Sequence, residues 1–225
     1  MKKFLILISI LFVVFLIYLS YIDQKVYFLS LSDQNGLSKN NYSLKVKNYL
    51  QKKDLLEVYL SEFSEPNLRT TDLIYKIKEN EKKTIQGKDH TIKNALIKAD
   101  LVLISVGNED LQKQLILEQN RKSNYDYIDS YIKDAKELIH LIKMYCKEDI
   151  FFLGIYNPEI KIKEEYITYV NQELKKICDQ ENISFIDYDP YLKENMYENM
   201  QINESGQEMI YYKIKNQLEN TLLKS

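Results

Sequence analysis

Short apolar runs alternate with longer amphipathic stretches along most of this sequence, and this alternation restricts the fold more than any other feature. The runs typical of buried strands are 26–31 (VYFLSL), 56–63 (LEVYLSEF), 101–106 (LVLISV), 150–156 (IFFLGIY) and 183–188 (ISFIDY). The patterns typical of helices cover 40–52, 70–80, 91–99, 124–146, 163–178 and 204–223. The segment 79–90 is charged and contains Gly87, so we expect an exposed loop there. Strands that alternate with helices form parallel sheets covered on both faces. We therefore expect an α/β fold, a flavodoxin-like three-layer α/β/α sandwich around a five-stranded parallel sheet.

The first 22 residues differ in kind from the rest of the chain. Lys2 and Lys3 precede a nearly uninterrupted apolar run, 4–19. Extended to residue 22, this run approaches the roughly 20 residues that cross a bilayer core, and no cleavage site of the Ala-x-Ala kind follows it. We expect an N-terminal transmembrane helix over 1–22, an uncleaved signal-anchor whose lysines stay in the cytoplasm. The single remaining domain, 23–225, would then lie on the extracytoplasmic side of the cell membrane.

Charge and cysteine content narrow the possible partners. The 31 basic and 33 acidic residues are mixed along the chain, and the formal net charge is −2. Without a basic face, nucleic acid is not an expected partner. No histidine or cysteine spacing matches a metal site, and we expect neither metal nor cofactor. The two cysteines, Cys146 and Cys178, occupy equivalent places after helical patterns, so they either form a disulfide or remain two buried thiols. The sequence carries no prediction of oligomeric state.

Glycine and proline residues mark one edge of the predicted sheet. Those just beyond predicted strand ends are Gly36, Gly107, Pro66, Pro158 and Pro190. In open α/β sheets, ligands bind outside the carboxyl ends of the strands. The site candidates at this edge are therefore Ser32, the turn 62–67, residues 107–110, Asn157 and Asp189.

Ser32 follows the first predicted strand, at the lip of a loop. A serine hydrolase needs a serine activated by a base, together with donors aimed at the oxyanion of the tetrahedral intermediate. The stretch VGNED, 106–110, offers the backbone amide of Gly107 or Asn108, with the Asn108 side chain as a further donor. Ser32 is thus either a nucleophile or a small polar residue where the chain turns.

The stretch FLSLSDQNG, 28–36, resembles the first block of the SGNH/GDSL hydrolases, ALGDSLTxG. In this register Ser30 replaces the glycine, Leu31 replaces the aspartate, Ser32 keeps the nucleophile position and Gly36 is kept. The resemblance continues along nearly the whole domain, through FFLGIYNPE, where Asn157 begins an Asn-Pro pair, and ISFIDYDPYL. It implies the SGNH fold and, in an intact member, ester hydrolysis by a serine nucleophile.

VGNED is similar to the family's Gly-x-Asn-Asp block, with Gly107 and Asp110 kept. Glu109 stands where the family has its oxyanion asparagine. An ionised carboxylate cannot donate a hydrogen bond, and its charge opposes the oxyanion. The block that supplies a glycine amide maps near EPNLRTTDL, 65–73, where Asn67 or Leu68 takes the glycine's place and a Leu68 side chain would narrow the pocket.

ENMQINESGQEMI, 198–210, resembles the family's last block, DxxHPNxxGYxxI. Glu198 takes the position of the aspartate and Gln201 that of the histidine. A glutamine cannot accept a proton near neutral pH, so the base that would activate the serine is missing from its place. The two histidines are no substitute: His140 lies among apolar residues in a helical pattern, which favours a structural role, and His90 precedes a helix at the opposite end of the sheet.

The resemblance therefore implies a divergent member with degenerate catalytic blocks. We predict an outward-facing, membrane-anchored binding or scaffold module that lacks efficient catalysis, because loss of a triad histidine or an oxyanion donor lowers the rate by orders of magnitude. The alternative is an active serine esterase that uses Ser32 on small acyl esters or acetylated glycans. A third interpretation has Glu109, Asp110 and Glu198 converge as a carboxylate site. The ligand would be an acyl ester or a glycan, with Tyr156, Tyr188 and Tyr191 as possible pocket walls.

Overall fold

Five parallel strands form the central sheet of the computed structural model, which describes residues 25–33, 40–85, 87–117, 124–157, 162–192, 194–198 and 201–221. The strands are β1 (Val26–Ser32), β2 (Leu56–Leu60), β5 (Leu101–Ser105), β6 (Asp149–Leu153) and β7 (Ser184–Ile186). Their order is β2-β1-β5-β6-β7, and every neighbouring pair is parallel. This is the strand order of the flavodoxin-like fold. The predicted fold class is confirmed for the sheet.

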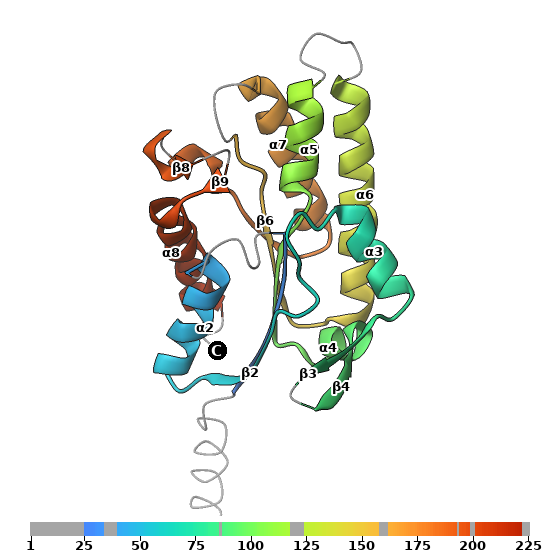
Figure 1. Ribbon diagram of the computed structural model, residues 1–225, viewed down its shortest axis with the longest axis vertical. Coiled ribbons are helices and arrows are strands. Elements are labelled where there is room, and N and C mark those ends of the chain that lie inside the picture. Colours follow the sequence, from blue (N-terminus) through green and yellow to red (C-terminus); the bar gives the residue numbers. More distant parts are fainter. Residues whose placement is uncertain are drawn as a thin grey trace, which may run out of the picture.

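Helices cover both faces of this sheet (Figure 1). On one face lie α2 (Tyr42–Lys52) and α8 (Glu204–Thr221), and on the other α3 (Thr70–Lys78), α4 (Ile92–Lys98), α5 (Asn108–Leu117), α6 (Asn124–Tyr145) and α7 (Glu164–Gln180). The side chains of β1 alternate between the two cores: Phe28 packs with Val46 of α2, whereas Leu29 packs in the cluster that contains Leu138 of α6. Burial on both sides explains why the strand sequences are apolar throughout.

A β-hairpin occupies most of the segment expected to be an exposed loop. It comprises β3 (Lys82–Ile85) and β4 (Lys88–Thr91), and Gly87 has a φ of 77° between them. The loop prediction for 79–90 was wrong because the hairpin stands mostly in solvent, where charged side chains replace the apolar alternation that marks a strand. Cross-strand polar contacts hold it, including Thr84 with Asp89 at 2.7 Å.

Helix α5 is a second element that the sequence pattern missed. It begins at Asn108, within the stretch expected to be a loop, and Glu109 and Asp110 lie in its first turn, where carboxylates complement the helix dipole. Near the last helix, the chain forms η1 (Asp189–Tyr191), η2 (Glu194–Met196) and the two-residue strands β8 (Tyr197–Glu198) and β9 (Gln201–Ile202). The predicted site stretches after β5 and before α8 are therefore both parts of regular elements.

The predicted membrane anchor, 1–22, lies outside the described residues. No helix in the described part of the chain has the length and apolar character needed to cross a membrane. Both cysteines are buried and free, which decides between the two alternatives for Cys146 and Cys178. Burial raises the pKa of both thiols, that of Cys178 to about 12.

Candidate functional site

Ser32 is the last residue of β1 and is 2% exposed. Its hydroxyl lies 3.0 Å from the phenolic oxygen of Tyr42, the first residue of α2. Its backbone N–H donates to the hydroxyl of Ser64 at 2.9 Å, and that hydroxyl donates to the carbonyl of Ser30. The serine thus lies at the end of the strand, as expected, and it is held there by buried hydrogen bonds.

Asp33 follows Ser32 and is completely buried. Its carboxylate accepts the backbone N–H of Asn108 at 3.0 Å, and its own N–H donates to the carbonyl of Ser105. Its carbonyl accepts the N–H of Asn67 at 3.2 Å. Asp33 therefore joins the end of β1 to the start of α5 and to the turn after β2. The Ser-Asp pair after an apolar run was the available sequence signal for this residue, and our register overlooked it.

The two backbone amides proposed as oxyanion donors are already used. Gly107 donates its N–H to the carbonyl of Leu68 at 3.2 Å, and Asn108 donates to Asp33. The expectation that these amides point into an open site was wrong for this conformation. Gly107 has a φ of 80°, and a Cβ there would lie 2.5 Å from Thr70 Oγ1 and 2.7 Å from Tyr131 Cε2. Both the backbone angle and the space require glycine.

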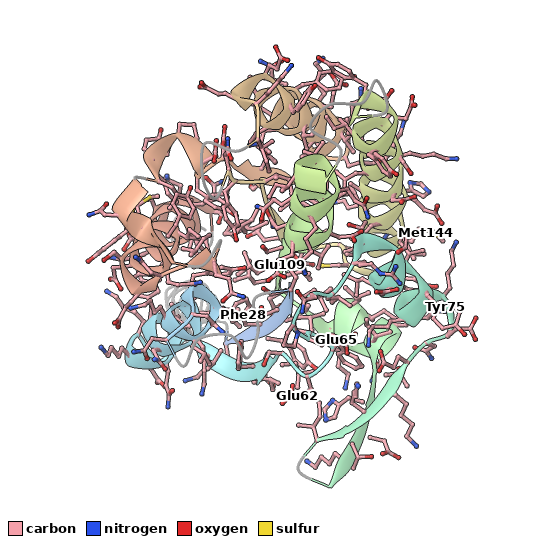
Figure 2. The ribbon with its side chains drawn as sticks, turned by 45° about the horizontal axis from the view of Figure 1, so that its top comes forward. Phe28, Glu62, Glu65, Tyr75, Glu109 and Met144 are labelled. Atoms are coloured by element: carbon pink, nitrogen blue, oxygen red, sulfur yellow. The ribbon has the colours of Figure 1, made fainter. Side chains whose placement is uncertain are left out.

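The Asn108 side chain is buried, and neither its amide nitrogen nor its oxygen has a hydrogen-bond partner among the described residues. The Glu109 side chain is 11% exposed, with Oε2 3.1 Å from Lys113 Nζ and Oε1 buried without a partner there. Glu109 lies at the start of α5, near the middle of the view in Figure 2. Asp110 points to solvent.

The turn after β2 presents Asn67 but not the side chain of Leu68. Asn67 is exposed, has a φ of 60°, and accepts a hydrogen bond from Lys113 Nζ at 3.3 Å. Leu68 is fully buried in the core between the sheet and the layer of helices α3 to α7. The prediction that its side chain narrows a pocket was therefore wrong. The positive φ of Asn67 is the conformation that a glycine would adopt most easily.

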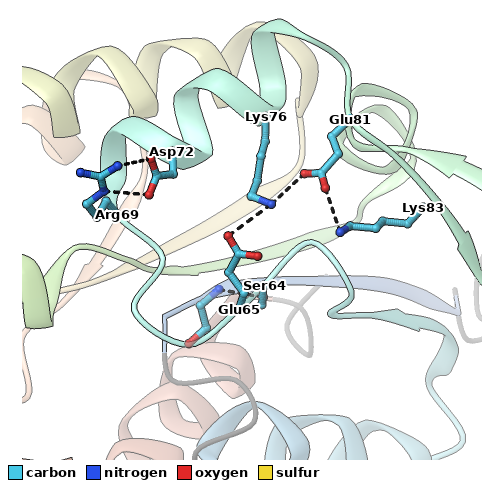
Figure 3. Close-up of polar contacts among 8 residues, drawn as sticks. Ser64, Glu65, Arg69, Asp72, Lys76, Glu81 and Lys83 are labelled. Atoms are coloured by element: carbon cyan, nitrogen blue, oxygen red, sulfur yellow. Dashed lines mark hydrogen bonds and ion pairs between the residues drawn. The ribbon is translucent and has the colours of Figure 1, made fainter.

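A network of charged side chains holds the same turn (Figure 3). Lys76 of α3 is 14% exposed and lies between Glu65 of the turn, at 3.4 Å, and Glu81, at 2.9 Å, which also pairs with Lys83 of the hairpin. The network fixes the turn against α3 and β3. These charged side chains do not contact Ser32 or Asp33 in the described bonds, so we assign them a role in holding the turn and none in chemistry.

The stretch 198–210 is connected to the site by a hydrogen bond of Gln207 in α8. Its side-chain oxygen accepts the N–H of Tyr42 at 3.0 Å, which links α8 to the residue that pairs with Ser32. Gln201 is half-buried in β9, and its backbone pairs with that of Glu198 in β8. The side chain of Glu198 lies outside the described part of the structure. Asn203 accepts the N–H of Gly206, so the residues in register with the family form the start of α8.

Asn157 and Asp189 meet beyond β6 and β7. The Asn157 N–H donates to the Asp189 carboxylate at 2.7 Å, and its side-chain amide donates to the carbonyl of Ile162. Burial raises the pKa of Asp189 to about 6, and the neighbouring Asp187 and Glu164 add to the increase. This pair joins the residue that follows β6 by a short stretch to the start of η1, and none of the described hydrogen bonds connects it to Ser32.

Of the three tyrosines expected near the site, two are core residues. Tyr156 and Tyr188 are fully buried with ring centroids 6.1 Å apart, and Tyr197 stacks on Tyr156 at 5.8 Å. Tyr191 is 52% exposed, with Lys213 over its ring. The hydroxyl of Tyr156 has no partner among the described residues, and burial, with Asp33 and Glu109 nearby, raises its pKa well above 10.

The histidines lie away from Ser32. The His140 side chain is 68% exposed on α6 and faces Glu181 at 3.8 Å, so its expected structural role in the core was wrong. The helical period places Leu138 and Ile139 inward and turns His140 outward. His90 stands opposite Lys83 in the hairpin. Among the described residues, no group of histidine, cysteine or carboxylate side chains has the arrangement of a metal site.

No family model and no curated protein matches this sequence. Solved structures do match it. The lipase Lip_vut3 from a goat rumen metagenome has a TM-score of 0.69 at 18% identity, covering 84% of this chain and 95% of its own. A mutant of Axe2, an acetyl-xylooligosaccharide esterase from Geobacillus stearothermophilus, has a TM-score of 0.62 at 16% identity, covering 85% of this chain and 92% of its own. The acetyl xylan esterase AlAXEase has a TM-score of 0.60 at 14% identity, covering 85% and 98%.

These solved structures are esterases and lipases of the SGNH/GDSL type, and the present chain has a divergent form of their fold. The likeness extends over most of each molecule, as the resemblance of the sequence blocks implied. At this level of identity it establishes the fold and leaves the chemistry to the residues at the strand ends.

Proposed function

We propose that this SGNH hydrolase-like domain is a binding module without efficient ester hydrolysis, and that residues 1–22 hold it at the outer side of a cell membrane. The observation that carries the proposal is the partner of Ser32. Where an active serine hydrolase has an imidazole, the hydroxyl here lies 3.0 Å from the phenol of Tyr42.

Tyr42 is unsuited to act as the missing base. Its complete burial, with the nearby Asp33 carboxylate, raises the pKa of its phenol well above the ordinary value of 10. The phenol therefore keeps its proton at neutral pH and cannot take one from Ser32. Gln201, at the position that corresponds to the family's histidine, cannot take one either.

The arrangement of these groups also indicates that an oxyanion would be only weakly stabilised. The N–H groups of Gly107 and Asn108 are bonded to Leu68 and Asp33, and Glu109 brings a carboxylate to the position of the oxyanion asparagine. Removal of one oxyanion donor costs about 100- to 1000-fold in rate. Together with the glutamine at the position of the family's histidine, this argues for binding and against turnover.

An active esterase that uses Ser32 on small acyl esters or acetylated glycans is the second candidate. The fold favours it, because the similar solved structures include an acetyl-xylooligosaccharide esterase and an acetyl xylan esterase. The rearrangement it requires is substantial, since Ser32 would have to become exposed and leave Tyr42.

The deciding experiment measures acetate release from p-nitrophenyl acetate and acetylated xylo-oligosaccharides by the full chain in detergent. We expect the wild-type rate to equal that of Ser32→Ala. A wild-type rate that Ser32→Ala abolishes would establish the esterase instead. The double variant Gln201→His with Glu109→Asn tests the alignment, because a serine-dependent gain in rate requires both positions to lie beside Ser32.

The membrane location has its own test. We expect the full chain to stay in the membrane fraction after a carbonate wash, and protease added to intact cells to digest the domain. Recovery of the chain in the soluble fraction would contradict the anchor, and protection from protease would contradict its orientation.

A further inference from the structure

Several polar side chains at the ends of β5 and β6 present buried hydrogen-bonding atoms without a partner among the described residues, and three of these side chains are considered together. They are the Asn108 amide, the Glu109 Oε1 and the Tyr156 hydroxyl. Asn108 and Tyr156 are at least nine-tenths buried. Gln112, one helical turn after Asn108 on α5, donates its side-chain amide to the carbonyl of Tyr156 at 2.7 Å, so Tyr156 lies beside the first turns of the helix that carries Asn108 and Glu109. Buried polar groups without partners are costly, so a cluster of them marks a place where another molecule completes the bonds.

The carboxylate of Glu109 determines which kind of ligand atom fits. In the resembling family, this position donates a hydrogen bond to an ester oxygen. An ionised carboxylate only accepts hydrogen bonds, and the carboxylate of Asp33, bonded to the N–H of the adjacent Asn108, brings a second negative charge to the start of α5. The complementary ligand atom is therefore a donor, such as a hydroxyl, and an ester carbonyl or an oxyanion is opposed.

The charge of Lys113 favours a neutral hydrogen-bond donor over a cationic one as the ligand group. Its ammonium lies 3.1 Å from the other oxygen of Glu109 and also reaches Asn67 at 3.3 Å. It compensates the Glu109 charge and would repel a second ammonium group. The remaining Oε1, with the donor and acceptor of Asn108 and the hydroxyl of Tyr156, suits a group that both donates and accepts. Sugar hydroxyls have this property.

We propose that the cluster of Asn108, Glu109 and Tyr156 binds the free hydroxyl groups of a neutral saccharide and discriminates against the acetylated form of the same saccharide. This inference rests on the proposed function and specifies its ligand. Acetylation replaces a hydroxyl donor with an ester that only accepts, so the Glu109 oxygen loses its partner. In an esterase of this fold, the preferred ligand would be the acetylated one.

The test compares binding of xylotetraose with acetylated xylotetraose to the full chain in detergent by isothermal titration calorimetry. We expect the unacetylated sugar to bind about tenfold more tightly, because one hydrogen bond to a charged acceptor is lost in the ester. Equal affinity, tighter binding of the acetylated sugar, or no binding of either would overturn the ligand assignment.

Glu109→Gln supplies the second readout. The amide retains the size of the side chain but can donate, so the ratio of the two affinities should approach one or reverse. Glu165→Gln is the matched control, because Glu165 also lies in the first turn of a helix, α7, and is exposed beside Lys163. It should leave the ratio unchanged. A ratio that responds to neither or to both variants would refute the role of Glu109.

Acetate is measured in the same samples. Release of acetate that depends on Ser32 would refute the binding module of the proposed function. Binding without release, but with a preference for the acetylated sugar, would refute only the inference about hydroxyl groups. The wild-type ratio of affinities requires no variant, so it decides the question even if Glu109→Gln does not fold.

Discussion

Gly107 allows the sharpest test of the strand-end geometry, because Gly87 provides a matched comparison. Both glycines have positive φ, 80° and 77°, but a Cβ at Gly107 meets Thr70 Oγ1 at 2.5 Å and Tyr131 Cε2 at 2.7 Å, whereas a Cβ at Gly87 meets nothing within 4 Å. The left-handed backbone costs a side-chain-bearing residue about 1–2 kcal/mol. Overpacking of a buried site adds about 1–3 kcal/mol. Gly107→Ala should therefore lower the free energy of unfolding by about 2–5 kcal/mol and Gly87→Ala by about 1–2 kcal/mol.

Urea unfolding of the full chain in detergent, followed by far-ultraviolet circular dichroism, measures both variants against the wild type. The quantity to compare is the urea midpoint at unchanged slope, because a changed slope reports a different unfolded or native state. Equal midpoints for the two variants would refute the steric argument, since only the packing differs between the sites. A wild-type midpoint for Gly107→Ala would refute the strand-end geometry itself.

Three further predictions concern titration, thiols and charge. Asp189 has a pKa of about 6 against an ordinary 3.8, so its contribution to stability is complete below pH 3.8 and is lost as the pH rises through 6. Asp189→Asn should remove on the order of 2–3 kcal/mol of the pH dependence of the free energy of unfolding between pH 4 and 7. Identical pH profiles for the variant and the wild type would contradict this. Ellman's reagent should modify neither Cys146 nor Cys178 in the folded chain and both in urea, because both thiols are buried and free; a single reactive thiol in the native state would be incompatible with that burial. Lys76→Met should destabilise the chain by about 1 kcal/mol more than Lys78→Met, since Lys76 compensates two carboxylates at 14% exposure and Lys78 pairs with one at 55%; the difference in urea midpoint checks it.

The sheet was predictable because its strands are buried on both faces and carry uninterrupted apolar runs. The predicted strands that extend beyond the observed strand ends share one cause. The run 150–156 continues past Leu153, where β6 ends, because Ile155 and Tyr156 remain buried in the loop. An apolar residue signals burial whether or not its backbone belongs to a ladder. The hairpin at β3 and β4 is the opposite case, since the cross-strand contacts of Asp89 with Lys82 and Thr84 hold strands that have no apolar alternation.

The candidate site was only partly predictable, for a different reason. The order of the blocks placed Ser32, Gly107 and Glu109 at one edge of the sheet, and the structure brings them to neighbouring strand ends. Whether an amide faces a ligand or a neighbouring residue depends on contacts between distant segments. Asp33 with Asn108 spans 75 residues of sequence, and Tyr42 with Gln207 spans 165. Local patterns contain no signal for such pairs.

Stability and catalysis draw on the same backbone donors at this edge of the sheet. The N–H of Asn108 can hold the buried Asp33 carboxylate or stabilise an oxyanion, and here it holds the carboxylate. Leaving a buried carboxylate without that bond would cost about 1–3 kcal/mol or more. A histidine introduced at Gln201 supplies a base but releases neither this amide nor that of Gly107. Relative to Gln201→His alone, the added Glu109→Asn should therefore raise the rate by no more than about the 100- to 1000-fold that a single oxyanion donor provides. A larger gain would mean that Asp33 gives up its bond when substrate binds, and the strand end would be an adaptable part of the site instead of a fixed one.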